Sequence, residues 1–215
     1  MSRPSAALPV VVLVSGNGSN LQAILDRADA IGIQLRAVIS DRPQAQALAR
    51  ARDAGVTTQT IRAKDHPDRE SYDAALIRAV DRYGAKLVVL AGFMRILGPD
   101  FVRRYTGRLL NIHPSLLPKY RGLHTHRRAL EAGDTRHGCS VHFVTEELDA
   151  GAVIAQAVVP ILPGDDEAAL RVRVQGVEHV MYPEVIGWFS AGRLGFEGGR
   201  ATLDGAPLST PKIFN

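Results

Sequence analysis

An apolar run that passes directly into a glycine-containing loop and then a helix is the feature that most restricts how this chain can fold. Residues 9–14 read PVVVLV, and residues 15–20 read SGNGSN. Apolar, β-branched residues at both odd and even positions are typical of a strand that is covered on both faces, as in a parallel sheet. From Leu21 onward the apolar residues recur at steps of three and four, which indicates a helix. The chain is therefore predicted to begin with a strand, a loop and a helix.

The same alternation continues through the first half of the chain. Further strands are predicted at residues 36–40, 58–61, 86–91 and 109–112, and helices at residues 44–54 and 68–83. Alternating strands and helices of this length predict an α/β class: a doubly wound, mostly parallel, Rossmann-like sheet with helices on both faces.

The pattern changes in the last third of the chain. Two strand-like runs, residues 139–144 and 152–160, are joined by the turn TEELDAG, which predicts an antiparallel C-terminal elaboration of the sheet. A long helix should follow, with a bend at Pro183. We expect a disordered tail over residues 1–8, one domain over residues 9–190, and a hairpin and tail of the same domain over residues 191–215.

Composition restricts the class of protein. The 215 residues amount to about 1.4 typical domain lengths. Hydrophobic residues at 46% and charged residues at 22% match a globular chain. The net charge of +4 is scattered, which argues against nucleic acid as a partner, and no run is long and apolar enough for a membrane span or a signal segment. The single cysteine, Cys139, fits a reducing compartment, so we expect a cytoplasmic location.

The loop at residues 15–20 is a candidate anion site. It lies between a predicted buried strand and a helix, where free backbone N–H groups and the helix dipole favour a phosphate. It lacks the third glycine of a dinucleotide-binding loop and the lysine of a P-loop. A tight turn that needs glycine for its backbone angles explains the loop equally well.

Asn111 and His113 form a second candidate site at the end of a predicted strand. Because side chains alternate along a strand, both should lie on one face. Histidine can move a proton near neutral pH, and an asparagine amide can donate to a developing oxyanion. For an isolated Asn-x-His, capping of the strand end by bonds to the backbone is the favoured alternative.

Asp149 is the third candidate, in the turn that also contains Glu146 and Glu147. Such a cluster is usually a solvated acidic turn. If folding places Asp149 beside His113, its carboxylate would favour the imidazolium form.

A metal site is another possible interpretation of the histidines and the cysteine. Five potential ligands fall within twenty residues: His124, His126, His137, Cys139 and His142. Their spacing gives no tetrahedral set, because His142 should face away from His137 and Cys139 in a strand. We therefore expect no metal.

Several long motifs, in this order, resemble one family. They are VSGNGSNLQAI (14–24), VLAGFMRIL (89–97), RLLNIHPSLLPKYRGLHTH (108–126), GCSVHFVTEELDAG (138–151) and VQGVEH (174–179). Together they closely resemble the phosphoribosylglycinamide formyltransferases, a family of folate-dependent formyltransferases. The resemblance extends from about Pro9 to Leu203.

This resemblance implies an activity. The expected reaction transfers the formyl group of 10-formyltetrahydrofolate, a co-substrate, to the amino group of glycinamide ribonucleotide. The products would be formylglycinamide ribonucleotide and tetrahydrofolate, in de novo purine (IMP) biosynthesis. Residues 9–190 would be the catalytic domain of a monomer or weak homodimer whose partners are small molecules.

The resemblance also implies residue roles. Asn111, His113 and Asp149 would be catalytic. The ribonucleotide would contact Gly18, Ser19, Asn20, Gln175, Gly176, Val177 and Glu178. Folate would contact Arg69, Met94, Arg95, Ile96, Leu97, Asn111, Thr145, Glu146, Glu147, Leu148 and Asp149. Three positions depart from the family pattern, Arg121, Cys139 and Ala150, and they bear on the folate side.

Other functions remain as alternatives. The first is a hydrolase that removes the formyl group of 10-formyltetrahydrofolate with water as the acceptor. A methionyl-tRNA formyltransferase would need a further tRNA-binding domain, and a sugar-nucleotide formyltransferase would not explain the loop at residues 15–20. The last alternative is a noncatalytic nucleotide-binding module, which the three intact candidate catalytic residues argue against.

Overall fold

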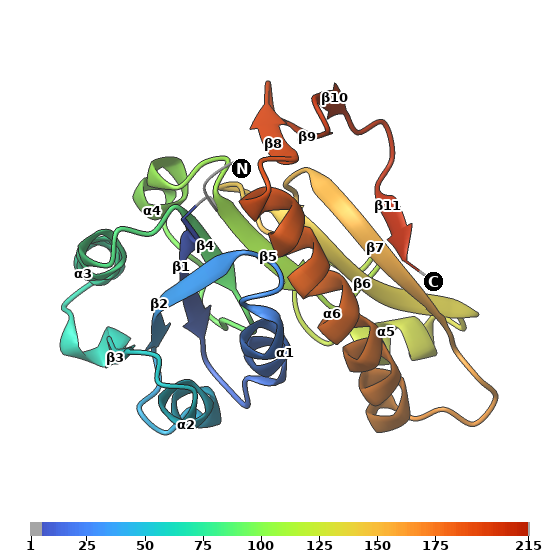
Figure 1. Ribbon diagram of the computed structural model, residues 1–215. Coiled ribbons are helices and arrows are strands. Elements are labelled where there is room, and N and C mark those ends of the chain that lie inside the picture. Colours follow the sequence, from blue (N-terminus) through green and yellow to red (C-terminus); the bar gives the residue numbers. More distant parts are fainter. Residues whose placement is uncertain (1–5, 215) are drawn as a thin grey trace.

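A large sheet forms the centre of the molecule in the computed structural model, which describes residues 6–214 (Figure 1). Its eight strands are β1 (Leu8–Val14), β2 (Ile33–Ser40), β3 (Thr58–Thr60), β4 (Leu87–Leu90), β5 (Leu109–His113), β6 (Arg136–Phe143), β7 (Val153–Pro160) and β11 (Lys212–Phe214). Their order across the sheet is β11-β7-β6-β5-β4-β1-β2-β3. A separate small sheet contains β8 (Leu194–Glu197), β9 (Arg200–Leu203) and β10 (Ala206–Pro207).

The pairing confirms a mostly parallel, doubly wound sheet with an antiparallel elaboration. β1 pairs in parallel with β2 and β4, β2 with β3, β4 with β5, and β7 with β11. β6 runs antiparallel to both β5 and β7. Because β1 lies between β2 and β4, the order of the strands reverses there. Open α/β sheets bind their ligands at the carboxyl ends of the strands beside such a reversal.

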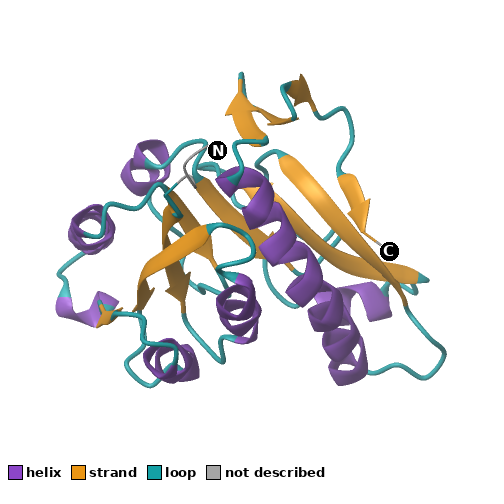
Figure 2. Cartoon of the chain, viewed as in Figure 1, coloured by secondary structure: helices purple, strands orange, loops and turns teal. Residues whose placement is uncertain are grey.

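Helices cover both faces of the sheet (Figure 2). They are α1 (Ser19–Arg27), α2 (Gln46–Asp53), α3 (Arg69–Arg82), α4 (Pro99–Arg104), α5 (Thr125–Glu131) and α6 (Glu167–Ser190), with a short 3-10 helix, η1 (Ala63–Asp65), before α3. Val10, Val12 and Val14 pack with α1, α2 and α6 on one face, whereas Val11 and Leu13 pack with α3 and α4 on the other. This double burial explains why β1 is apolar on both parities.

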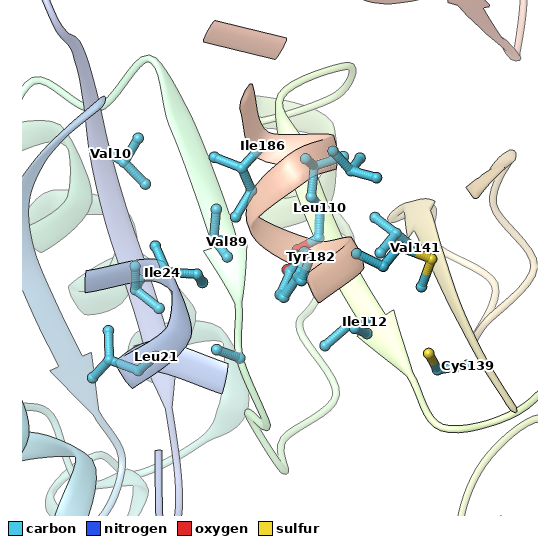
Figure 3. Packing of buried hydrophobic residues seen from close by; sticks show 14 of the residues in the cluster. Val10, Leu21, Ile24, Val89, Leu110, Ile112, Cys139, Val141, Tyr182 and Ile186 are labelled. Atoms are coloured by element: carbon cyan, nitrogen blue, oxygen red, sulfur yellow. Dashed lines mark hydrogen bonds between the residues drawn. The ribbon is translucent and has the colours of Figure 1, made fainter. Parts of the chain in front are cut away.

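The long helix α6 is fixed to the centre of the sheet. Figure 3 shows Tyr182 and Ile186 of α6 among side chains of the central strands, including Val89 and Leu110. The Tyr182 hydroxyl is fully buried and lies 2.9 Å from the carbonyl oxygen of Leu90 and 3.1 Å from that of Leu110. The helix continues across Pro183. This contact holds α6 against the two strands, β4 and β5, whose ends carry the candidate site.

Several predicted boundaries were wrong. β2 begins at Ile33 rather than at residue 36, and the short helices α4 and α5 were not predicted. α4 has six residues and α5 has seven, which is too short for a clear helical pattern. β1 begins at Leu8, inside the expected tail, and residues 1–5 of that tail lie outside the described residues. The hairpin predicted within residues 191–215 is confirmed as β8 and β9.

No helix within residues 6–214 has both the length and the apolar character needed to cross a membrane.

Candidate active site

A cavity of about 440 Å³ opens where β4 and β5 end. Its lining includes residues 92–97, which follow β4, residues 122–126, and all of the turn at residues 144–149 except Glu147. Asn111 and His113 lie at its floor, at the end of β5, and Asp149 enters from the turn. Three candidate residues that are separated in the sequence therefore share one cavity, beside the reversal in strand order.

His113 is held between two acceptors. Its Nε2 atom lies 2.9 Å from the carbonyl oxygen of Tyr120, and its Nδ1 atom lies 3.4 Å from Asp149 Oδ2. The same Asp149 oxygen accepts the backbone N–H of Gly122 at 2.9 Å. Because the Tyr120 carbonyl oxygen can only accept, Nε2 is the ring nitrogen that carries a hydrogen in this contact. The sequence analysis gave the contact between Asp149 and His113 only as a condition. The structure contains this contact.

His142 is a site residue that sequence reasoning missed. It was considered only as a metal ligand, but the antiparallel pairing of β5 with β6 places it directly opposite Asn111. Its Nδ1 atom lies 2.9 Å from the Phe143 carbonyl oxygen, so Nδ1 carries the hydrogen and Nε2 is left as an acceptor. Burial lowers the pKa of His142 to about 4, so the ring is neutral at pH 7.

The neutral His142 ring orients the Asn111 amide. Asn111 Nδ2 donates to His142 Nε2 over 3.0 Å, which identifies the nitrogen end of the amide. Asn111 keeps a second N–H that this bond does not use. Since Asn111 lines the cavity, that N–H is available to an oxygen bound there.

The predicted anion loop adopts the shape needed for an anion site. Gly18 is the N-cap of α1 with φ of 79°, and no side chain caps the helix. The backbone N–H groups of the first turn, where Ser19 and Asn20 lie, therefore have no side-chain acceptor from the cap. The loop adjoins the cavity, because Ser15 N–H donates to the carbonyl oxygen of Gly92 at 3.1 Å and Gly92 lines the cavity.

Gly18→Ala is expected to destabilise the protein. A Cβ atom at Gly18 would lie 2.6 Å from the Ala47 Cβ atom, and the positive φ adds strain. We expect a loss of about 2–4 kcal/mol in the free energy of unfolding, measured by urea denaturation. Gly164→Ala is the matched control, since Gly164 has φ of 83° but open space around it, and it should lose only about 1 kcal/mol. Equal losses in the two variants would contradict the close contact with α2.

The second predicted ribonucleotide segment lies against the first. Asn20 Nδ2, on α1, donates to Glu178 Oε2, on α6, at 2.8 Å, across 158 positions of sequence. The other three residues of this segment, Gln175, Gly176 and Val177, lie on the preceding turn of α6 and are partly or fully exposed. Folding therefore brings the two predicted ribonucleotide segments together through α1 and α6.

Glu178 carries an unusual carboxyl group. Burial raises its pKa to about 7, and the bond from Asn20 opposes this only partly. A raised carboxyl pKa stabilises the fold below pH 4.5, and that stability is lost as pH rises to about 7. We therefore expect Glu178→Gln to gain about 2–4 kcal/mol relative to the unchanged protein between pH 4.5 and pH 8, measured by urea denaturation. A constant difference between the two proteins across this range would contradict the shift.

Most of the predicted folate residues line the cavity. These are Met94, Arg95, Ile96, Leu97, Asn111, Thr145, Glu146, Leu148 and Asp149. Two do not line it. Glu147 instead pairs with Arg121 at 2.6 Å, and Arg69 lies beside the wall and donates to the carbonyl oxygen of Leu97 at 2.6 Å.

The three departures from the family pattern have different surroundings. Arg121 uses its position to pair with Glu147 across the two loops that border the cavity. Cys139 is buried in the core beneath α6, as expected for an apolar filler, and burial raises the pKa of its thiol. Ala150 has no positive φ, so its backbone does not require glycine.

No three His, Cys, Asp or Glu side chains within residues 6–214 gather in a way that could hold a metal ion. His126 Nδ1 and His137 Nε2 do meet at 3.1 Å, but His142 lies apart from them, against Asn111.

The chain is similar to known proteins over most of its length. Residues 8–186 match the family model described as formyl transferase. The chain is 58% identical to phosphoribosylglycinamide formyltransferase of Escherichia coli, over 93% of this chain and 95% of that protein. It is 44% identical to the protein of the same name from Haemophilus influenzae, with the same coverage. The solved structure of phosphoribosylglycinamide formyltransferase from Coxiella burnetii superposes with a TM-score of 0.93, at 51% identity, over 97% of this chain and 99% of that chain.

Proposed function

Because this chain belongs to the formyl transferase family, we propose that it transfers the formyl group of 10-formyltetrahydrofolate to the amino group of glycinamide ribonucleotide. The products are formylglycinamide ribonucleotide and tetrahydrofolate, in purine biosynthesis. The observation that carries this proposal is the convergence of Asn111, His113 and Asp149 in one cavity that adjoins the anion loop of α1. The names of the relatives, at up to 58% identity over nearly the whole chain, support this reaction rather than hydrolysis.

The reacting groups divide between the two sides of the site. The ribonucleotide phosphate binds the N–H groups at Gly18, Ser19 and Asn20, and Glu178 accepts from the ribose hydroxyls. The folate lies along the wall formed by residues 94–97 and the turn at residues 145–149. With both substrates bound in this way, the amine and the formyl carbon would meet at the end of β5, where proximity lowers the barrier to attack.

The oxyanion requires donors that are already in place. As the amine attacks, the formyl C=O becomes a tetrahedral alkoxide, to which Asn111 offers its second N–H and His113 offers its Nε2–H. At present His113 Nε2–H is occupied by the Tyr120 carbonyl oxygen. Donation from Nε2 to the oxyanion therefore requires the loop that contains Tyr120 to give way when substrates bind.

Collapse of the intermediate needs one proton transfer. The new bond joins the formyl carbon to the substrate amine, and the bond that breaks joins it to N10 of the folate. The proton lost by the amine is carried to N10, by His113 or by water held at Asp149. The bond that forms, the bond that breaks and the proton that moves all belong to the two substrates and these side chains. No step requires a metal.

One assay distinguishes the reactions that this site can perform. The purified protein is given 10-formyltetrahydrofolate with and without glycinamide ribonucleotide, and release of tetrahydrofolate is followed. Release that depends on the ribonucleotide supports the proposal. Release without it means a hydrolase, and no release in either case leaves a binding module. The cytoplasmic location and the monomer or weak homodimer remain predictions.

A further inference from the structure

The part of the cavity lining that follows β4 is weakly fixed by its own main chain. Residues 93–98, which we call the wall segment, belong to neither a helix nor a strand. Within the described part of the chain, residues 93–97 make no backbone–backbone hydrogen bond. The side chains of Phe93 and Leu97 are buried in the core, and the three residues between these two are exposed beside the cavity. The position of the wall segment therefore depends on side chains that bind its backbone.

Side chains from distant parts of the sequence bind the wall segment near both of its ends. Ser15 Oγ accepts the Met94 N–H at 2.8 Å, and Asp73 Oδ2 accepts the Gly98 N–H at 2.7 Å. Ser15 is 1% exposed and Asp73 is 4% exposed. Because both bonds are shielded from water, loss of either side chain would leave a backbone N–H without its partner.

Ser15 also begins the loop at residues 15–20, which is the candidate anion site. Its own N–H donates to the carbonyl oxygen of Gly92 at 3.1 Å, so Ser15 is joined to the chain after β4 through both its backbone and its side chain. Beyond Ser15 the loop continues through two exposed residues to Gly18, the N-cap of α1. A short stretch of loop thus connects the wall segment to the candidate phosphate site.

We propose that Ser15 is a positioning residue that couples the binding of the two substrates. Binding of the ribonucleotide phosphate orders the anion loop and Ser15, and Ser15 in turn orders the wall segment, so folate binds more tightly. This inference rests on the proposed function, which places the phosphate at residues 18–20 and the folate along residues 94–97. A first ligand that orders a shared segment lowers the entropy cost of ordering it for a second ligand. Ser15 does not line the cavity, and it acts through the Met94 N–H.

Asp73 offers a matched comparison. It binds the same wall segment through a hydrogen bond of similar length, but it lies on α3. The helix α3 packs on the face of the sheet opposite to α1, where the anion loop ends. Loss of Asp73 should therefore loosen the wall segment to the same extent whether or not the ribonucleotide is bound.

The experiment measures the dissociation constant of tetrahydrofolate with and without saturating glycinamide ribonucleotide. Tetrahydrofolate has no formyl group to transfer, so the ternary complex does not react. We expect the ribonucleotide to lower this dissociation constant by about fivefold, the lower end of the usual coupling between two sites. Because such coupling is reciprocal, tetrahydrofolate should lower the dissociation constant of the ribonucleotide by the same factor.

Two substitutions assign the coupling to a residue. In Ser15→Ala the two dissociation constants of tetrahydrofolate should become equal, while the ribonucleotide alone still binds, because the backbone N–H groups of the anion loop remain. In Asp73→Ala both dissociation constants should rise and their ratio should stay unchanged. Three outcomes would overturn the proposal: a ratio that survives in Ser15→Ala, a ratio lost equally in Asp73→Ala, or no coupling in the unchanged protein.

Hydrogen exchange provides a second measurement on the unchanged protein. The ribonucleotide alone should slow exchange of the Met94 N–H, because a bonded amide exchanges when its segment opens. Exchange that the bound ribonucleotide leaves unaltered would contradict the ordering of the wall segment. Failure of the proposed function would look different, because the ribonucleotide would then neither bind nor be needed for release of tetrahydrofolate from the formyl donor.

Discussion

Asp149→Asn is expected to lower kcat for formyl transfer by about 10²- to 10⁴-fold, the range typical of losing a proton-transfer group. The replacement keeps the shape of the side chain, and an amide oxygen can still accept the Gly122 N–H that now bonds Asp149 Oδ2. It removes the carboxylate that lies 3.4 Å from His113 Nδ1, so the imidazole ring loses its carboxylate partner. The measurement is a single-turnover rate with both substrates saturating, beside the dissociation constant of the ribonucleotide.

The ribonucleotide dissociation constant, measured beside kcat, separates a catalytic role of Asp149 from a binding or structural one. Under the proposed function the ribonucleotide binds at α1 and α6, so its dissociation constant should change less than threefold in Asp149→Asn. Asp204→Asn is the matched control, since it removes an exposed carboxylate that pairs with Arg193 next to the strands of the small sheet, and its kcat should be unchanged. If Asp149→Asn lost ribonucleotide affinity as much as turnover, Asp149 would bind or fold rather than catalyse.

The fold class could be predicted because a strand buried on both faces requires apolar residues at successive positions. Residues 9–14 are apolar on both parities, and the structure places them between two helical layers as β1. The steps of three and four after Leu21 likewise reflect a helix with one face against the sheet, where Leu21 and Ile24 are buried. Local patterns of this kind need no knowledge of which strands pair.

The partner and register of each strand could not be predicted from the sequence. β5 and β6 run antiparallel, with Asn111 opposite His142, and nothing in either segment specifies that partner or that register. The importance of His142 depends entirely on this pairing. The parity argument correctly separated His142 from Cys139, but it could not say what His142 would face. β11 was missed for a related reason, because its three residues form a strand only through contact with β7.

Two arguments of unequal strength led to the candidate catalytic residues. Alternation along a strand correctly predicted that Asn111 and His113 share a face, yet the residues alone favoured a capping role. Asp149 is 36 positions from His113, and no local rule predicts a contact over that separation. The family resemblance supplied the grouping, and the 3.4 Å contact between His113 and Asp149 gives it a physical basis.

Asn111→Ala is expected to lower kcat by about 10²- to 10³-fold, which is the usual effect of removing one preorganised oxyanion donor. The dissociation constants of ribonucleotide and folate should change little, because the lost N–H bonds strongly only when the carbonyl oxygen becomes an alkoxide. Some stability should also be lost, about 1–3 kcal/mol, because the buried His142 Nε2 no longer receives its hydrogen bond. Stopped-flow single-turnover rates and urea denaturation measure the two effects separately.

The hydrogen bond between Asn111 and His142 can be tested by substituting both residues. If His142 acts by orienting the Asn111 amide, then His142→Leu should lower kcat by itself, and adding His142→Leu to Asn111→Ala should cause no further loss. The two residues would then be coupled almost completely, as expected for side chains joined by the 3.0 Å bond between Asn111 Nδ2 and His142 Nε2. Losses that simply multiply would mean that His142 contributes to turnover independently of Asn111, through its 3.7 Å approach to Asp149 Oδ1.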